Sequence, residues 1–326
     1  MSLQKAEHTL FVGAAGTGTA YGLCWSARQH FGDRIRIVVA DTNPRHLVAA
    51  SALSDAFEQL PPVASGEFPA ALGAALRRHR VDTYQPILDE EIVLAAEMAR
   101  DGRIPASVSV LAPSPEVAAL CFDKFETARR LRAAGLPSPD TDLIADVAWR
   151  EEGLVVKPRF GRGSLGVDFL KTVADLNAVR MRSELVAQEK CAPPELTIDT
   201  FRSRRGNLFR AICRERIEVK AGVCTKARVF EDEELSSMAR HLCDALGLTG
   251  TICFQVMRRS DGSWAITDVN PRPGAGTRMS AAAGVDVLLA ALLDAWGDDP
   301  LPAIPRLTGE RFVVRSFHEN VFDAPR

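Results

Sequence analysis

Apolar and polar positions alternate with two different periods in the first third of the chain. Apolar runs at residues 9–12 and 35–40 have the length of buried strands, whereas residues 68–80 and 90–100 carry apolar side chains at helical spacing. Strands separated by helices predict a parallel sheet with helices on its faces. We therefore expect residues 1–113 to form an α/β domain with a Rossmann-like parallel sheet.

The pattern changes after the proline-rich segment at residues 137–139. From residue 153 onward, apolar strands are joined mostly by tight turns, such as Arg-Arg-Gly-Asn at residues 204–207 and Ser-Asp-Gly-Ser at residues 260–263. Strands connected by hairpins predict an α+β region with antiparallel sheets. The expected divisions are residues 1–113, residues 114–300 with a smaller subdomain at about 140–190, and a C-terminal strand and tail at residues 301–326.

Composition narrows the classes of partner. The chain has 326 residues, of which 46% are hydrophobic and 25% are charged, and its formal net charge is -2. A nearly neutral chain without blocks of like charge does not predict binding to nucleic acid or to an anionic membrane.

Seven scattered cysteines without a C-x-x-C spacing predict neither a disulfide framework nor a zinc site, and they favour a reducing, cytoplasmic location. The N-terminus lacks the pattern of a signal peptide, and the apolar run at residues 287–293 is too short to cross a bilayer.

A glycine cluster follows the first predicted strand. Gly13, Gly16 and Gly18 have the spacing G-x-x-G-x-G, and Asp41 ends the next strand. A dinucleotide-binding turn has the spacing G-x-G-x-x-G, with an acidic residue about 20 positions further on. Because the spacing differs, we favour a structural role for these glycines. An oxidoreductase that binds NAD(P) at this cluster is the alternative.

A second glycine-rich loop follows Lys157, which lies at the end of an apolar strand. Gly161, Gly163 and Gly166 alternate with arginine and other residues in the sequence PRFGRGSLG. Backbone N–H groups in such a loop, together with a lysine, can bind phosphate groups and move as a flexible lid. Taken alone, the same pattern also fits an ordinary solvated turn.

The most specific pattern lies in the predicted hairpin at residues 250–270. Gln255 and Asp268 are on two strands joined by a tight turn, so they can face each other across the hairpin. Asp268 and Asn270 are two positions apart and leave the same face of their strand. Oxygen ligands of this kind suit Mg²⁺, which takes the rest of its coordination from phosphates and water. Arg272 follows, where a cation could neutralise a transferring phosphoryl group.

These motifs resemble those of ATP-grasp enzymes, and most closely one synthetase half of the carbamoyl-phosphate synthase large subunit and its single-module relatives. The segment DVNPRPG resembles the metal motif E-x-N-P-R, VVKP resembles the central lysine strand, and CFDKFETARRLRAAGLPSP resembles the segment with the first ATP-contacting lysine. The resemblance covers about residues 114–300. The preceding domain fits the family's N-terminal sheet, in which YQPILDEE resembles a segment that shapes the substrate cleft. Two features depart from the family: Asp268 stands where most members have Glu, and the chain has one ATP-grasp unit rather than two.

The resemblance implies a role for each matching residue. Lys157 and Arg272 would be the catalytic residues, acting on phosphate charge. The segment Gln-Glu-Lys at residues 188–190 would meet adenine through its backbone, and Glu195 would contact the ribose. The residues implied in ATP binding are Lys124, Lys157, Gly161, Gly163, Ser164, Gly166, Glu189, Lys190 and Glu195. The implied metal ligands are Gln255, Asp268 and Asn270.

The expected activity is that of an ATP-dependent ligase that joins a carboxylate to an amine through an acyl phosphate, with release of ADP and phosphate. Phosphoryl transfer needs mainly positioning and charge neutralisation, which these residues would supply together with Mg²⁺ or Mn²⁺. The partners would be small-molecule carboxylate and amine substrates, and a homodimer is left open. Arg216 and Lys220 are candidate contacts of a substrate carboxylate, although an ordinary charged strand explains them equally well. The alternatives are the NAD(P)-dependent oxidoreductase and a non-catalytic ATP-binding sensor.

Overall fold

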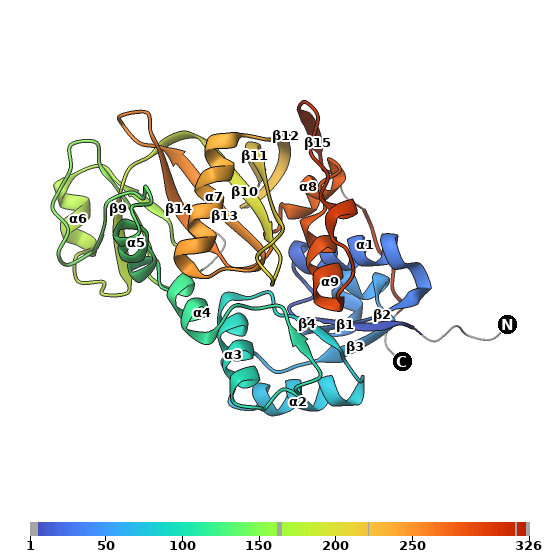
Figure 1. The fold of residues 1–326 in the computed structure, drawn as a ribbon. Coiled ribbons are helices and arrows are strands. Elements are labelled where there is room, and N and C mark those ends of the chain that lie inside the picture. Colours follow the sequence, from blue (N-terminus) through green and yellow to red (C-terminus); the bar gives the residue numbers. More distant parts are fainter. Residues whose placement is uncertain (1–5, 162–164, 221, 317, 324–326) are drawn as a thin grey trace.

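Three β-sheets organise the chain, each with its own helices (Figure 1). The structure is a computed structural model that describes residues 6–161, 165–220, 222–316 and 318–323. One sheet is parallel and the other two are antiparallel, as the sequence predicted. The helices are α1 (Gly18–Phe31), α2 (Phe68–Arg78), α3 (Asp89–Arg100), α4 (Pro115–Phe122), α5 (Lys124–Ala133), α6 (Val173–Val179), α7 (Glu233–Leu246), α8 (Thr277–Ala282) and α9 (Val287–Trp296).

The N-terminal sheet is parallel and has the order β3-β2-β1-β4-β5. Its strands are β1 (His8–Val12), β2 (Ile35–Asp41), β3 (Ala56–Gln59), β4 (Thr83–Gln85) and β5 (Ser109–Val110). Strand β3 was not predicted, because Ala56-Phe57-Glu58-Gln59 has no apolar run or alternation, and its pairing with β2 defines it. The central strand β1 has no exposed residue, as expected for a strand covered by helices on both faces.

The large sheet is antiparallel and has the order β14-β13-β10-β11-β12-β15. Its strands are β10 (Ala192–Arg202), β11 (Phe209–Lys220), β12 (Val223–Phe230), β13 (Gly250–Arg258), β14 (Trp264–Asn270) and β15 (Arg311–Val314). The two tight turns predicted from the sequence join β10 to β11 and β13 to β14. Gln255 and Asp268 are paired directly across the second hairpin, so the predicted opposition of these two side chains is confirmed.

The small sheet is antiparallel, has the order β6-β9-β7-β8 and packs against α6. Its strands are β6 (Thr141–Leu143), β7 (Leu154–Pro158), β8 (Asp168–Leu170) and β9 (Leu185–Glu189). Figure 1 shows this sheet at the end of the molecule away from the N-terminal sheet. Its own apolar cluster includes Ile144, Val156 and Leu176, which are almost completely buried. A separate core of this kind allows a small unit to move as one body.

The helices near the site begin at capping residues that satisfy their first free N–H groups. Thr17 Oγ1 accepts from the amide of Ala20 at the start of α1, and Ser114 Oγ accepts from Val117 at the start of α4. The carboxylate of Asp123 accepts from the second and third amides of α5. These caps fix where each helix starts, and so fix the position of Lys124, the first residue of α5.

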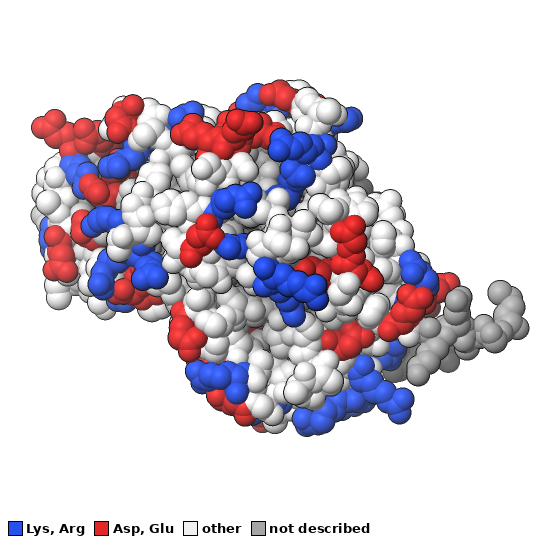
Figure 2. Space-filling model, in the orientation of Figure 1, with Lys and Arg blue, Asp and Glu red and all other residues white. Residues whose placement is uncertain are grey.

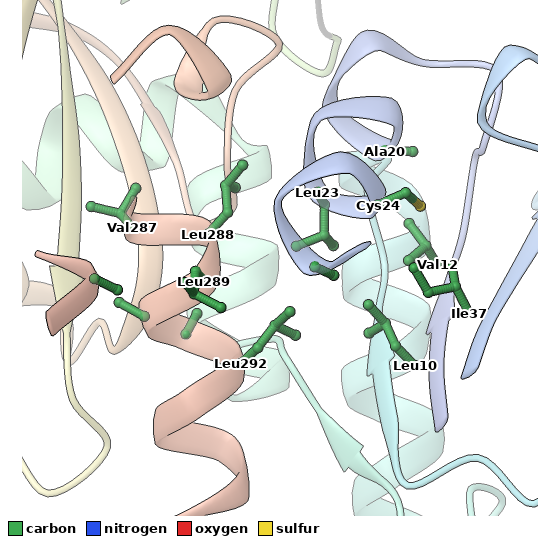
Figure 3. Packing of buried hydrophobic residues seen from close by; sticks show 14 of the residues in the cluster. Leu10, Val12, Ala20, Leu23, Cys24, Ile37, Val287, Leu288, Leu289 and Leu292 are labelled. Atoms are coloured by element: carbon green, nitrogen blue, oxygen red, sulfur yellow. The ribbon is translucent and has the colours of Figure 1, made fainter. Parts of the chain in front are cut away.

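One apolar cluster joins the N-terminal sheet to the large sheet through α9. Figure 3 shows leucines of α9, including Leu289 and Leu292, on the side that faces α1 and β1. Phe201 and Val229 of the large sheet belong to the same buried cluster. Helix α9 is apolar on nearly all sides, because it is packed between these layers. No helix in the described part of the chain is both long and apolar enough to cross a membrane.

Charged side chains of both signs are interspersed on the face drawn in Figure 2, without a large area of one sign. Exposed ion pairs occur in the described part of the chain, such as Arg129 with Glu126 and Arg182 with Glu184. The seven cysteines are all free, as expected.

Candidate active site

A cleft between the small sheet and the large sheet contains several of the predicted site residues. We call it the small-sheet cleft; it encloses about 260 Å³. Val155, Val167, Phe169 and Met257 give it an apolar part, and Pro139 closes one side. Its polar part is lined by Lys124, Lys157, Gln188, Glu189, Glu195, Gln255 and Asp268. An apolar slot with a few convergent polar groups is typical of small-molecule sites.

Lys157 is buried at the end of β7, with 8% of its surface exposed. Its Nζ donates to the backbone oxygen of Thr267 at 2.9 Å, which places the ammonium beside Asp268. Burial lowers the pKa of Lys157 to about 8, against the opposing attraction of Asp268 and with a smaller contribution from Lys124. A cation held in a poorly solvated cleft, with one hydrogen bond to a neutral group, can interact strongly with an incoming anion.

Lys124 contacts the first glycine of the glycine loop. Its Nζ donates to the backbone oxygen of Gly161 at 2.5 Å. The ion pair between Arg159 and Asp123, with Nη2 and Oδ2 2.6 Å apart, fixes the start of the loop to the cap of α5. Both lysines therefore line the same cleft, as the prediction of two phosphate-contacting cations requires.

The glycine loop is described only at its two ends. Gly161 lines the small-sheet cleft. Gly166 has a φ of 72°, and a Cβ at this position would lie 3.0 Å from Cγ of Pro158, so a larger residue would be strained. The predicted contacts Gly163 and Ser164 lie outside the described residues.

The predicted adenine and ribose contacts are partly engaged within the protein. The carboxylate of Glu189 receives two hydrogen bonds from Arg259, both at 3.0 Å, and one from the amide of Asp140 at 3.1 Å. The side chain of Glu189 therefore connects the end of β9 to the large sheet. Glu195 lines the cleft but forms an ion pair with Arg216, and Lys190 is exposed and does not line the cleft. A contact of residues 188–190 with adenine through their backbone stays a prediction.

Gln255 and Asp268 line this cleft, and Asn270 is the last residue of β14, two positions after Asp268. Gln255 is paired with Asp268 across β13 and β14, and Asn270 Nδ2 donates to Asp268 Oδ2 at 3.0 Å. Among the described residues, no donor is bonded to the amide oxygen of Asn270 or to the second oxygen of Asp268. Within the described residues, no group of three or more His, Cys, Asp or Glu side chains could hold a metal ion. The donor set of one carboxylate and two amides fits Mg²⁺ only where other oxygens complete the coordination.

Arg272 is held by a residue of the N-terminal domain. Its Nε and Nη2 donate to the two oxygens of Asp89 at 2.9 and 3.3 Å, and its Nη1 donates to the backbone oxygen of Pro273. Asp89 is the first residue of α3 and lies in the segment YQPILDEE that was predicted to shape the substrate cleft. Three of the five N–H groups of Arg272 thus have acceptors within the described residues, and the other two have none there and can contact a ligand.

A second cleft adjoins the first and is shared at Gln255 and Asp268. We call it the arginine cleft; it encloses about 340 Å³ and is lined by Arg214, Arg216 and Arg272. The N-terminus of α1, at Thr17, Gly18 and Thr19, forms one wall, and Gly274, Ala275 and Gly276 form part of another. Of the two substrate contacts suggested by sequence, Arg216 lines this cleft, whereas Lys220 is exposed and does not.

The floor of the arginine cleft is a row of residues across four strands. Asp268 is paired with Gln255, Gln255 with Thr197, and Thr197 with Arg214. Residues paired in this way point to the same face of a sheet, and all four line the cleft. Neighbouring strands are about 4.8 Å apart, so the backbone positions of Asp268 and Arg214 are about 14 Å from each other.

Three residues of the arginine cleft and its support were not predicted: Asp89, Asp199 and Arg214. Asp199 and Arg214 form a buried ion pair, with Oδ2 and Nε 3.2 Å apart. The sequence contained a signal for this pair. Arg214 is two positions from Ile212, so both side chains lie on the same face of β11, and both are buried. A charged residue at a buried alternate position usually has a specific partner.

The N-terminal glycine cluster has a structural explanation. A Cβ at Gly13 would lie 1.8 Å from Oε1 of the buried Glu91, so the glycine permits close packing. Both oxygens of Asp41 accept hydrogen bonds within the chain, from the amide of Gly16 and from Asn43. These hydrogen bonds hold Asp41 within its own turn, which gives this residue a structural role as well. The geometry supports the structural role over the dinucleotide site.

Comparisons with known proteins agree with this architecture. Residues 121–276 match the ATP-grasp domain family. A D-alanine–D-alanine ligase of Pseudomonas fluorescens (strain Pf0-1) is 24% identical over 66% of this chain and 80% of its own. The N5-carboxyaminoimidazole synthetase from Staphylococcus aureus, solved with ADP, superposes with a TM-score of 0.71 at 16% identity, over 94% of this chain and 80% of its own.

A further solved structure has the same fold. The biotin carboxylase domain dimer of the Hydrogenobacter thermophilus 2-oxoglutarate carboxylase was solved with MgADP, ADP and bicarbonate. It has a TM-score of 0.71 at 14% identity, over 93% of this chain and 73% of its own. At this level of identity, both structural matches support the fold alone. Residues 121–276 are thus similar to the ATP-grasp domain, and the fold of the chain is like that of these two structures.

Proposed function

We propose that the protein is an ATP-dependent carboxylate–amine ligase that acts through an acyl phosphate and releases ADP and phosphate. The observation that carries this proposal is the junction of two clefts at Gln255 and Asp268. One cleft has the apolar slot and the lysines that suit a nucleoside triphosphate, and the other has arginines that suit an acid. A phosphoryl group at the junction would be within reach of both.

The nucleotide would lie in the small-sheet cleft. Its base would occupy the apolar part near Val155, Phe169 and Met257, and its phosphates would extend toward Lys124 and Lys157. The buried ammonium of Lys157, whose one hydrogen bond among the described residues goes to the backbone oxygen of Thr267, would gain a direct contact with a phosphate. ATP binding by this site is supported by the domain match and by the ADP in the similar synthetase.

Mg²⁺ would be held by Asp268, Asn270 and Gln255 together with oxygens of the triphosphate. When bound, it would neutralise charge on the transferring phosphoryl group. The protein's own part is to fix the three side chains: the hairpin pairs Gln255 with Asp268, and the hydrogen bond from Asn270 orients the carboxylate. The MgADP in the similar biotin carboxylase domain supports this choice of metal.

The acid would lie in the arginine cleft with its carboxylate toward Asp268 and Arg272. A carboxylate oxygen would attack the terminal phosphorus of ATP, the bond to the bridging oxygen would break, and ADP would leave. The amine would then attack the acyl carbon, phosphate would leave and one proton would be released. The free N–H groups of Arg272 would oppose the charge on the phosphoryl group, and Asp89 would hold them in place.

A screen of paired acids and amines tests the proposal. The purified protein with ATP and Mg²⁺ is incubated with each pair, and ADP, phosphate and the condensed product are measured by mass spectrometry. We expect at least one pair to give equal amounts of product and ADP. Lys157→Ala should reduce this turnover by about 10²- to 10³-fold, because a preorganised charged contact to the phosphates is lost.

The result also separates the two alternatives. An NAD(P)-dependent oxidoreductase would consume no ATP and would bind NADH or NADPH saturably, with binding lost on changing Asp41. A non-catalytic sensor would bind ATP without releasing ADP in any mixture. Equal turnover by the parent and Lys157→Ala would contradict the proposed role of this residue. As a matched control, Lys171→Ala changes an exposed lysine of the small-sheet region and should keep parental turnover.

A further inference from the structure

We propose that the acid substrate carries a second anionic group, and that Arg214, Thr19 and the first turn of α1 bind this group. The inference rests on the proposed function, because it assigns a substrate class to the cleft in which the acid would lie. Arg214 is at the opposite end of the four-residue row from Asp268. A substrate with its reacting carboxylate near Asp268 would extend along this row toward Arg214.

The guanidinium of Arg214 has N–H groups that the protein leaves unused. Its side chain is almost completely buried, with 2% of the residue exposed, and its Nε donates to Asp199. Arginine has five N–H donors, and the described residues offer no acceptor to the four on its terminal nitrogens. The terminal nitrogens are not among the buried side-chain atoms that lack a hydrogen-bond partner, so they are accessible from the cleft that Arg214 lines and can donate to an anion bound there.

The orientation of Arg214 is fixed from two sides. Asp199 accepts from Arg214 and also from the hydroxyl groups of Thr277 and Ser280, at 2.7 and 2.6 Å. On the other side, a Cβ at Gly276 would lie 2.2 Å from Nη1 of Arg214, so the glycine backbone lies directly against the guanidinium. The fork of Arg214 is therefore preorganised, which suits recognition of a carboxylate or phosphate.

The facing wall offers a second set of unused donors. Helix α1 has 14 residues, and its cap Thr17 satisfies the amide of Ala20 but leaves those of Gly18 and Thr19 without an acceptor among the described residues. Thr19 is 6% exposed, and its hydroxyl has no hydrogen-bond partner in the described part of the chain. Both Gly18 and Thr19 line the arginine cleft. Amides at a helix start favour an anion through direct bonds and through the helix dipole.

The charges around this end of the cleft also favour an anion. Arg315 donates to the backbone oxygen of Ala275, one of the lining residues. Burial lowers the pKa of Arg315, and the nearby cations Arg214 and Arg278 lower it further. The carboxylates that offset these three cations are Asp199 and Asp286, so positive charge is in excess.

Matched acids test the inference by binding, without any turnover. With ADP and Mg²⁺ present, glutarate, suberate and sebacate are titrated by calorimetry beside valerate, octanoate and decanoate, so that the length of the acid varies along the row. Phosphonoacetate and 3-phosphonopropionate form a third arm, which distinguishes a phosphate-like group from a second carboxylate. We expect at least one dianionic acid to bind about tenfold or more tightly than the monoacids, the loss expected for one charge-assisted contact.

Two variants and one control identify the binding residues. Arg214→Gln and Thr19→Val should each remove most of the preference for the dianionic acid. Thr19→Val is nearly isosteric, so it tests the anion site even if Arg214→Gln does not fold. Arg228→Gln, which changes an arginine paired with Glu215 and Glu310 outside the cleft, should keep the preference.

The outcome is separable from that of the proposed function. Titration of ADP alone is done first, and its failure to bind would contradict the nucleotide site rather than the anion site. The acids are also titrated without nucleotide. Equal affinity for dianionic acids and monoacids, or a preference that survives both Arg214→Gln and Thr19→Val, would overturn the inference even if ATP is turned over.

Discussion

Asp89 and Arg272 are 183 positions apart in the sequence and form an ion pair through both carboxylate oxygens. The pair connects the first residue of α3, in the N-terminal region, to the segment that follows the candidate metal ligands on β14. Both side chains are largely buried, so their geometry is restricted. The N-terminal region thereby takes part in the candidate site without supplying a residue to the nucleotide cleft.

Asp89→Asn should lower kcat of the ligase reaction by about tenfold or more while leaving ATP affinity nearly unchanged. The amide cannot hold the guanidinium through two charged oxygens, and a misplaced cation near the reacting groups is costly to the rate. Steady-state kinetics and ATP calorimetry measure the two effects. Asp101→Asn, just after the other end of α3 and exposed, is the matched control. Parental kcat in Asp89→Asn would show that the pair is only structural.

Lys157 should make the stability of the nucleotide-free protein depend on pH. Its pKa is about 8 in the folded protein and 10.5 for an ordinary lysine, so between these values the unfolded chain binds a proton that the folded protein does not. The free energy of unfolding should therefore rise with pH across this window, by about 3 kcal/mol in total. Below the folded pKa both states are protonated, and the penalty for the buried charge is fully present.

Urea unfolding of the parent and of Lys157→Met, from about pH 7 to pH 10, measures this contribution. The variant should lose the rise with pH, whereas Lys171→Met, at an exposed position, should retain it. The buried cysteines also change the free energy of unfolding at high pH, but they are present in all three proteins, so their contribution cancels when the variants are compared. Identical pH slopes in the parent and Lys157→Met would contradict the lowered pKa.

Local sequence patterns predicted those parts of the site that depend on one hairpin or one helix start. Gln255 and Asp268 face each other because a tight turn sets the register of β13 and β14. Lys124 follows a capping aspartate and so begins a helix. Alternation and capping act over a few residues, and they are visible in the sequence without knowledge of the tertiary structure.

Contacts between distant segments could not be predicted in the same way. The pair Asp89–Arg272 depends on how the N-terminal region packs against the large sheet, and each member alone is an ordinary charged residue. Asp199 and Arg214 lie on one hairpin but are not directly paired, so only the exact register of β10 and β11 shows their contact. The unused donors of Arg214 become visible only when its neighbours are counted. The short strand β3 was missed for a related reason, because pairing with β2 defines it rather than its own composition.

Gly13→Ala should destabilise the protein by about 1–3 kcal/mol, the usual cost of inserting a methyl group into a filled site. The added Cβ would overlap the carboxylate of Glu91, which accepts hydrogen bonds from Tyr84 at 2.7 Å and from the amide of Ile87 at 3.0 Å. Urea unfolding measures the loss. Gly66→Ala, where no atom lies within 4 Å of the added group, is the control. Equal stability of the two variants would remove the packing explanation for the N-terminal glycine.

Mg²⁺ should bind tightly only together with the nucleotide. The protein offers one carboxylate, Asp268, and two neutral amides, and one negative charge does not offset the dehydration of a small divalent ion. A triphosphate supplies the missing charge and oxygens. Calorimetry should therefore detect little Mg²⁺ binding to the nucleotide-free protein and tight binding of Mg²⁺ with a non-hydrolysable ATP analogue. Tight binding of Mg²⁺ alone would contradict this metal site.

Asp268→Asn should abolish turnover while nucleotide binding in the absence of metal is largely retained. The substitution keeps the size of the side chain and its position opposite Gln255, but it removes the anionic ligand of the candidate set. The apolar slot around Phe169 and Met257 is unchanged, so the base should still bind. Asp261→Asn, in the exposed turn between β13 and β14, is the matched control and should behave like the parent. The decisive measurement is nucleotide affinity with and without Mg²⁺. The metal should increase the affinity of the parent but not that of Asp268→Asn. Parental turnover by Asp268→Asn would exclude this carboxylate as the metal ligand.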